Sequence, residues 1–414
     1  MISLAQESRL ATETISNDAQ FIVAVARALH LYGTPSHQLE ETLAKISREL
    51  NLESQFLVTP TSIMMSVGEV PKQLTFLERV DGGETNLEKL NQLSLIIRRV
   101  VAGKTSTQAA VAEVKSLNDA PSEYGTGFMT CAYTLACGTS AIFFGGGWLE
   151  TAIASVVGLA LGLFSLIAER HPRIAGVVPV FGALFATVVS RFATNTWPPG
   201  VAFIGALGGL IVLVPGYTLT VAMNEIAHRH LVSGTARVTG ALVTFLQMGL
   251  GLALGSRISD ALFQVPPAAQ AIPVPTWAFW SSAVLASIAF TVLFHAHWRD
   301  APAILIGSLI ALLTSQFGAE SLGPVTGVAL SAWLLGCFSN AVARYNERPA
   351  ATTLVPGLLV LVPGSFGFRS VQALLNHDVV SGVEIGFSTT MTAMALVTGL
   401  FLANLTVSPR SVTF

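Results

Sequence analysis

A series of ten apolar runs after residue 124 constrains the fold of this chain more than any other feature. Each run has about 17 to 25 residues, enough to cross the hydrocarbon core of a bilayer as one helix. A water-soluble domain does not sustain such a pattern, so the runs predict a polytopic α-helical membrane protein with ten transmembrane helices. The runs are Phe128–Phe144, Trp148–Ala168, Ile174–Phe192, Gly200–Met223, Leu231–Leu254, Trp277–His295, Ala301–Phe317, Leu322–Ala343, Leu354–Leu375 and Ile385–Val407.

The charged residues are concentrated at the other end of the chain. Residues 1–124 carry 26 of the 46 charged side chains, including every lysine. This part alternates helical patterns with segments rich in β-branched and aromatic residues. It therefore predicts a small cytosolic α/β domain over residues 1–124, with the element order α-α-β-β-β-α-α and a regulatory or assembly role.

Two helix starts in this domain have recognisable caps. Thr34 precedes Pro35 and is the expected N-cap of a helix, and Asn86 is the expected cap of another. His37 and Glu41 are four residues apart and could begin a metal site, but no second cluster of ligands completes it. We expect these two side chains to lie on an exposed polar helix face.

One apolar segment occurs twice. "GLIVLVPG" ends at Gly216 and "GLLVLVPG" ends at Gly364, with seven of eight letters identical and an offset of 148 residues. The same offset aligns the first five apolar runs with the last five, which predicts two membrane repeats, 125–274 and 275–414. A repeat of five spans begins and ends on opposite sides of the membrane, so its tandem copy inserts upside down. The fold class expected is a 5+5 inverted repeat, an architecture typical of alternating-access transporters.

Arginine sets the expected orientation. With a cytosolic N-terminus, eight arginines lie at inside-facing ends (Arg170, Arg173, Arg229, Arg237, Arg299, Arg344, Arg348 and Arg410), against three outside (Arg191, Arg257 and Arg369). The positive-inside rule then favours both termini in the cytosol. The first twenty residues contain no apolar segment typical of a signal peptide. We expect a multi-pass protein of the cytoplasmic membrane.

The two Pro-Gly breaks are the first candidates for a substrate site. Proline ends or bends a helix, and a broken helix at membrane depth is tolerated only against protein or a wet cavity. A helix that restarts after the break presents free N–H groups and the positive end of its dipole, which suit a carboxylate. The candidate residues are Pro215, Gly216, Pro363 and Gly364, with Asn224 and Ser365 as polar neighbours.

Two charged residues follow the breaks. Glu225 lies nine residues after Gly216, and Arg369 lies five residues after Gly364. Ionisable groups at membrane depth usually have a partner or a function. Glu225 is the candidate proton-coupling acid or ammonium partner, and Arg369 the candidate carboxylate ligand. The alternative is that both lie at the water interface.

Four segments carry a resemblance to a known family. "ALHLYGTPSHQLEETLAKISRELNL" with "TPTSIMMSVGE" resembles the N-terminal signature of the threonine/serine exporter (ThrE-type) family, which includes fungal pheromone-regulated membrane relatives. "LVPGYTLTVAMNEIAHRHLVSG" and "LVPGSFGFRSVQALLNHDVVSG" resemble the membrane core and the second half, here fused in one chain. The resemblance spans about Phe21 to Thr406, and Glu225 falls where relatives carry an acid.

The resemblance implies export of threonine and serine driven by the proton motive force, with a small-molecule substrate, protons and the lipid bilayer as partners. An exporter of C4-dicarboxylates such as succinate on the same scaffold is the alternative, and a second arginine facing Arg369 would favour it. A channel is a further option. The sequence indicates no catalytic constellation, no metal site, no cofactor motif and no nucleic-acid-binding patch, and a homo-oligomer is left open.

Overall fold

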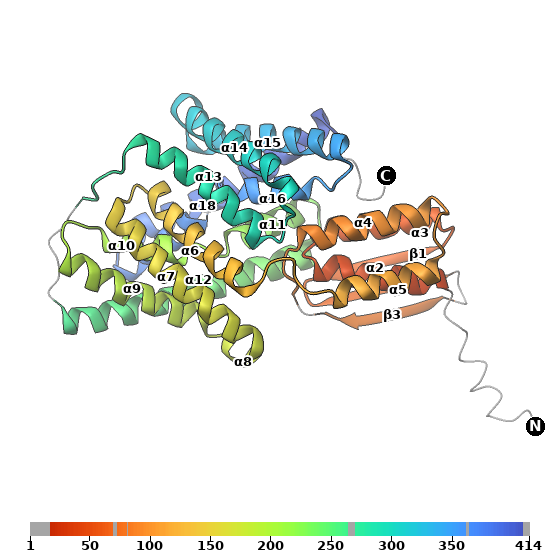
Figure 1. Cartoon of the computed structure of the whole chain (residues 1–414), viewed down its shortest axis with the longest axis horizontal. Coiled ribbons are helices and arrows are strands. Elements are labelled where there is room, and N and C mark those ends of the chain that lie inside the picture. Colours follow the sequence, from red (N-terminus) through yellow and green to blue (C-terminus); the bar gives the residue numbers. More distant parts are fainter. Residues whose placement is uncertain (1–16, 69–72, 81, 264–269, 362–363, 409–414) are drawn as a thin grey trace, which may run out of the picture. The chain divides into compact units, whose positions relative to one another are not determined.

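The computed structural model describes residues 17–68, 73–80, 82–263, 270–361 and 364–408 (Figure 1). The chain divides into two compact units, the first ending at Pro121 and the second beginning at Ser122. Each unit has its own buried core. The candidate site residues all belong to the second unit.

The first unit combines helices with a small antiparallel sheet of order β1-β2-β3. Helices α2 and α3 pack on one face of the sheet, where Val58, Ile63 and Met65 are buried. The elements follow the predicted order: α2 (Asn17–Leu31), α3 (Ser36–Glu49), β1 (Ser54–Thr59), β2 (Ser62–Val67), β3 (Leu74–Arg79), α4 (Leu87–Val101) and α5 (Thr107–Asp119).

One of the two predicted caps is confirmed and the other is wrong. The side chain of Asn86 accepts a hydrogen bond from the backbone N–H of Lys89, 2.9 Å away, at the start of α4. Thr34 does not cap α3, because the helix begins at Ser36 and Pro35 occupies the N-cap position. Pro35 therefore precedes α3 without a side-chain cap.

The polar face expected on α3 is only partly exposed. Glu41 lies in solvent, but His37 is buried. Glu40, beside them, accepts a hydrogen bond from the N–H of Val58 at 2.7 Å and so ties α3 to β1. The prediction of an exposed face is wrong for His37, because the buried face of α3 is wider than its apolar stripe and also includes polar residues such as Ser36 and Thr42.

All regular secondary-structure elements of the second unit are helices among the described residues. Eight of its helical segments are long and apolar enough to cross a membrane. The elements are α6 (Thr126–Phe143), α7 (Trp148–Arg170), α8 (Pro172–Ala175), α9 (Val178–Thr196), α10 (Ala202–Leu210), α11 (Gly216–Ala227), α12 (Leu231–Leu262), α13 (Thr276–Leu293), η1 (Trp298–Asp300), α14 (Ala301–Leu322), α15 (Pro324–Asn346), α16 (Ala351–Leu359), α17 (Gly364–Leu375) and α18 (Val379–Thr406).

Two of the ten predicted runs are not among the eight segments. One is α6, whose 18 residues include many threonines and other small or polar side chains. The other is the fourth run, which the break before Gly216 divides into the short helices α10 and α11.

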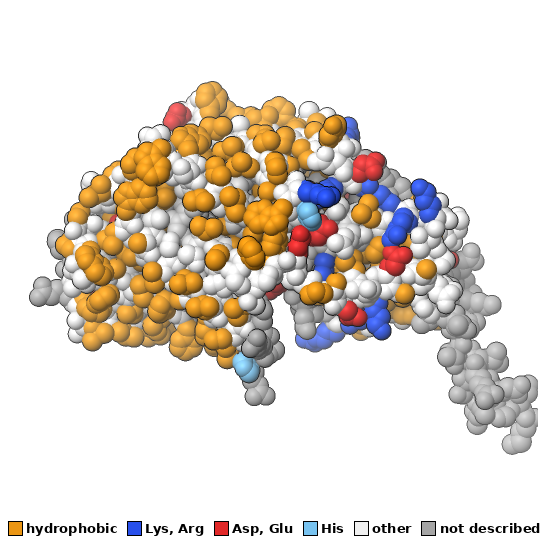
Figure 2. All heavy atoms as spheres, in the orientation of Figure 1, with side chains coloured by type: hydrophobic (Ala, Val, Ile, Leu, Met, Phe, Trp, Pro, Cys, Tyr) orange, Lys and Arg blue, Asp and Glu red, His pale blue; other side chains and the backbone are white. Residues whose placement is uncertain are grey.

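The surface of this unit supports a membrane location: Figure 2 shows apolar side chains spread over it, and Leu242, Leu246, Leu250 and Leu254 form an exposed stripe along α12.

The helices of the second unit recur in the same order at a nearly constant offset. The broken pairs α10–α11 and α16–α17 each consist of a 9-residue helix followed by a 12-residue helix. Their second helices begin 148 residues apart, at Gly216 and Gly364. Helices α6 and α13 both have 18 residues and begin 150 residues apart.

Corresponding helices also contact one another across the two sets. The end of α6 lies against the start of α13, where the rings of Phe143 and Phe279 are 5.6 Å apart. The residue before α6, Tyr124, has its ring 6.3 Å from that of His295, just past the end of α13. The two corresponding helices therefore pack antiparallel.

Candidate functional site

The first Pro-Gly break is a short run of turns between α10 and α11. Val214 donates its N–H back to Leu210, and Gly216 donates to Val214 at 2.8 Å. Pro215 has no N–H to continue the helix, and its carbonyl accepts the first bond of α11, from Leu219 at 3.0 Å. The chain is thus forced out of one helix and into the next at the predicted place.

The second break lies between α16 and α17, and its position is given by the residues at which these two helices end and begin. Helix α16 ends at Leu359 and α17 begins at Gly364. Pro363, the other predicted breaking residue, lies outside the described residues. The outcome at Gly364 still matches the first break, because a new helix begins there.

The two breaks meet. A Cβ atom placed on Gly364 would lie 2.9 Å from the Cα of Gly216 and 2.6 Å from Val214. Only glycine permits this approach, and both glycines are buried. The first N–H groups of a helix have no partner within the helix, and the helix dipole makes this end positive. Two positive helix ends therefore converge in the interior of the unit.

The two helices leave this point in opposite directions along α12. Gly234, near the start of α12, packs on Ile226 of α11. Further along α12, Phe245 packs on Gly367 of α17 and Gly249 packs on Val371. Because α12 rises about 1.5 Å per residue, the contacts with α11 and α17 are separated by about 15 Å or more.

Arg369 lies on α17, one to two turns past the junction of the helix starts. Its guanidinium carbon is 5.9 Å from the centroid of the Phe144 ring, at the end of α6. The Nε atom is buried and has no hydrogen-bond partner among the described residues. Ser365, between Gly364 and Arg369, is half-buried. A half-buried guanidinium with unpaired N–H donors can bind a carboxylate by donating two parallel hydrogen bonds to it.

Glu225 lies on α11 and has a partner that sequence analysis did not assign. Its side chain is 0% exposed, and its Oε2 is 3.0 Å from the Nε of Arg237 on α12. Arg237 is 24% exposed and compensates the buried carboxylate in addition to any role in topology. Asn224 is half-buried beside it, and its carbonyl accepts from the N–H of His228 at 3.0 Å.

The structure does not bring Glu225 and Arg369 together. Glu225 is about 13 Å along α11 from Gly216, and Arg369 is about 7 Å along α17 from Gly364. Because the two helices diverge, these two charges lie on opposite sides of the junction. Groups of three or more His, Cys, Asp or Glu side chains that could hold a metal ion do not occur among the described residues.

Two further buried acids were missed by sequence analysis. Glu150, in the first turn of α7, and Asp300, directly before α14, are 1% and 6% exposed. They follow tryptophans in the segments Trp148-Leu-Glu150 and Trp298-Arg-Asp300, which are 150 residues apart. This repeated Trp-x-acid pattern was the signal that could have identified them.

Comparison with known proteins identifies relatives along almost the whole chain. A family model described as "Putative threonine/serine exporter" (ThrE) matches residues 20–259, and a second, "Threonine/Serine exporter, ThrE", matches residues 280–406. Pheromone-regulated membrane protein 10 of Kluyveromyces lactis is 24% identical over 94% of this chain and 44% of its own length. The protein of the same name from Saccharomyces cerevisiae is 24% identical over 94% of this chain and 54% of its own.

The chain thus spans about half the length of these curated relatives. No solved structure is similar enough to match.

Proposed function

Because the chain belongs to the threonine/serine exporter (ThrE) family, we propose that it is a secondary transporter that exports threonine and serine across the cytoplasmic membrane. The observation that carries this proposal is the junction of two helix starts at Gly216 and Gly364, with Arg369 beside it. Two dipole ends and one guanidinium form a binding place for the carboxylate of an amino acid.

The arrangement of the helices supports alternating access as the mechanism. Helices α6 and α13 correspond in the repeat and pack antiparallel, so a two-fold axis relating them is perpendicular to both. If these helices cross the bilayer, the axis lies in the membrane plane, as in an inverted repeat. The convergence of the two corresponding glycines at one point supports a substrate site on this axis.

Glu225 is the proposed proton carrier. Protonation removes the negative charge that Arg237 compensates, so the ion pair loses its attraction and the arginine becomes available to another anion. Transport driven by the proton motive force then follows from alternate exposure of Glu225 to the two sides. In the proposed orientation both termini are cytosolic, which a fusion reporter at Phe414 would test.

The choice of substrate depends on how many arginines reach the site. A dicarboxylate calls for a second free cation opposite Arg369. Of the two arginines on α12, Arg237 pairs with Glu225 and Arg257 is exposed. This favours a substrate with one carboxylate and an ammonium group over succinate.

Counterflow in proteoliposomes tests the function directly. Vesicles containing the purified protein are loaded with threonine, serine or succinate, and uptake of the same labelled compound from outside is followed. We expect transient accumulation with threonine and serine. Accumulation with succinate alone would replace the substrate assignment, and equilibration without counterflow would indicate a channel.

A further inference from the structure

The buried acids Glu150 and Asp300 occupy corresponding positions in the two sets of helices. Each lies two residues after a tryptophan, at the start of the second long helix of its set. The corresponding tryptophans, Trp148 and Trp298, are 150 residues apart, the same offset that relates the starts of α6 and α13. A buried carboxylate must be satisfied by hydrogen bonds or by a countercharge.

Glu150 satisfies its oxygens with backbone donors from two elements. Its Oε2 accepts from the N–H of Gly147 at 2.8 Å, and its Oε1 accepts from the N–H of Val201 at 2.7 Å. Val201 is the residue directly before α10. Glu150 therefore ties the start of α7 to the start of the first broken helix.

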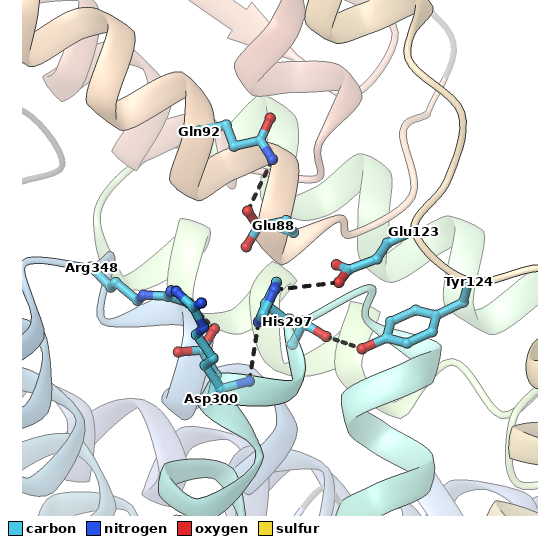
Figure 3. A network of polar contacts seen from close by, with 9 residues as sticks. Glu88, Gln92, Glu123, Tyr124, His297, Asp300 and Arg348 are labelled. Atoms are coloured by element: carbon cyan, nitrogen blue, oxygen red, sulfur yellow. Dashed lines mark hydrogen bonds and ion pairs between the residues drawn. The ribbon is translucent and has the colours of Figure 1, made fainter.

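Asp300 makes the corresponding connection with an ion pair. Its Oδ2 accepts from the Nη1 of Arg348, which lies three residues before the start of α16, the second broken helix (Figure 3). Beside it, the Nδ1 of His297 accepts from the N–H of Arg299, and the Nε2 of His297 is 3.6 Å from Glu123. Asp300 therefore ties the start of α14 to the start of α16.

The two acids lie at opposite ends of the second unit. Tyr124, directly before α6, donates its hydroxyl to the carbonyl of Ala296 and packs edge-on against Trp298. The start of α6 is thus beside the Asp300 segment, whereas Glu150 follows the end of α6. The 18 residues of α6 separate these two levels by about 27 Å.

We propose that Glu150 and Asp300 are paired gate tethers, each of which holds the start of one broken helix closed at its own end of the transporter. Releasing one tether frees the start of α10 or of α16 and opens the path from that end to the junction at Gly216 and Gly364. The proposal rests on alternating access in the proposed function. The tethers differ in chemistry: that of Asp300 is an ion pair, and that of Glu150 uses neutral N–H donors.

The test measures which end is open and does not require transport. Cys131, Cys137 and Cys337 are replaced by serine in the full chain, and Ser365→Cys beside the junction serves as the only thiol. An impermeant maleimide is added to right-side-out or inside-out membrane vesicles, and the ratio of the two labelling rates is the readout. Asp300→Asn should shift this ratio about tenfold toward access from the Asp300 end, and Glu150→Gln should shift it in the opposite direction.

Two controls make this result specific to the tethers. Asp260→Asn removes another carboxylate, one that pairs with Arg191 at 3.2 Å between α12 and α9, and should leave the ratio unchanged. Exchanging the charges by Asp300→Arg with Arg348→Asp should restore the original ratio. If Asp300→Asn does not fold, Asp300→Asn with Arg348→Gln leaves no unpaired charge and should give the same shift.

Two outcomes would overturn the proposal: equal shifts in one direction for both acids, or an unchanged ratio in folded variants. If the labelling ratios of the two variants shift in opposite directions but the protein shows no counterflow with any substrate, the tethers are retained and the exporter proposal is rejected. Counterflow of threonine or serine, together with an unchanged labelling ratio in the folded Glu150 and Asp300 variants, would retain the exporter and reject the tethers.

Discussion

The ion pair between Glu225 and Arg237 permits the sharpest test of the proposed coupling, because its two partners differ in exposure. Glu225 is 0% exposed and Arg237 is 24% exposed. Arg237→Gln removes the arginine that pairs with a fully buried carboxylate, which costs about 3–5 kcal/mol. Glu225→Gln leaves an arginine that reaches solvent, so we expect the smaller loss of about 1.5–3 kcal/mol that accompanies a broken charge-assisted hydrogen bond.

The double variant separates the pair from its surroundings. With both members of the pair removed, no buried carboxylate requires Arg237, so Glu225→Gln with Arg237→Gln should be no less stable than Arg237→Gln alone. The free energy of unfolding of the four proteins, measured in the same detergent by denaturant titration, gives the coupling energy. Strictly additive losses would refute the interdependence of the two residues.

The same variants report on transport. Glu225→Gln has the shape of the protonated acid but cannot titrate. We expect it to retain threonine exchange and to lose accumulation driven by a pH gradient. If Glu225→Gln still accumulates threonine with the original pH dependence, the proton carrier is another residue.

Three further substitutions test the remaining features. Arg369→Ala should weaken substrate affinity about ten- to a hundredfold in counterflow titrations, the value of one charge-assisted hydrogen bond, whereas the exposed Arg257→Ala should not. Gly364→Ala should abolish transport or lower the unfolding temperature, because its Cβ would lie within 3 Å of Gly216, and Gly240→Ala, with open space around it, should do neither. Asn86→Ala removes the cap of α4 and should cost about 1 kcal/mol, measured by thermal unfolding of the full chain.

Sequence analysis predicted structure best where the residue type alone determines the local backbone conformation. Proline lacks an N–H in every environment, so the break before Gly216 followed from the residue type alone. The same holds for the strands of the first unit and for the cap at Asn86, which depend on local propensity. Thr34 shows the limit of such arguments: it has the right residue type for a cap, but α3 begins one residue later than expected and Pro35 takes the N-cap position.

Pairs of side chains from distant segments could not be predicted in this way. Arg237 was interpreted from its position near a span end, where the positive-inside rule applies to any arginine. Its contact with Glu225 depends on the angle between α11 and α12, which Gly234 sets by letting the two helices approach. Likewise, Asp300 meets Arg348 across 48 residues only because η1 and the segment before α16 share one end of the unit.

The corresponding helices of the second unit show that these unpredicted pairs still form a pattern. The two broken pairs share backbone features, namely the lengths of their helices and the glycines at which they meet. Their charges differ: Arg369 lies on the second broken helix and the Glu225–Arg237 pair lies at the first, while Asp300 forms an ion pair and Glu150 accepts from backbone N–H groups. In the proposed mechanism, similar backbones with different charges would give two states of similar packing but different electrostatics. A proton can shift the balance between two such states, because protonation of Glu225 changes the charge on one side of the junction only.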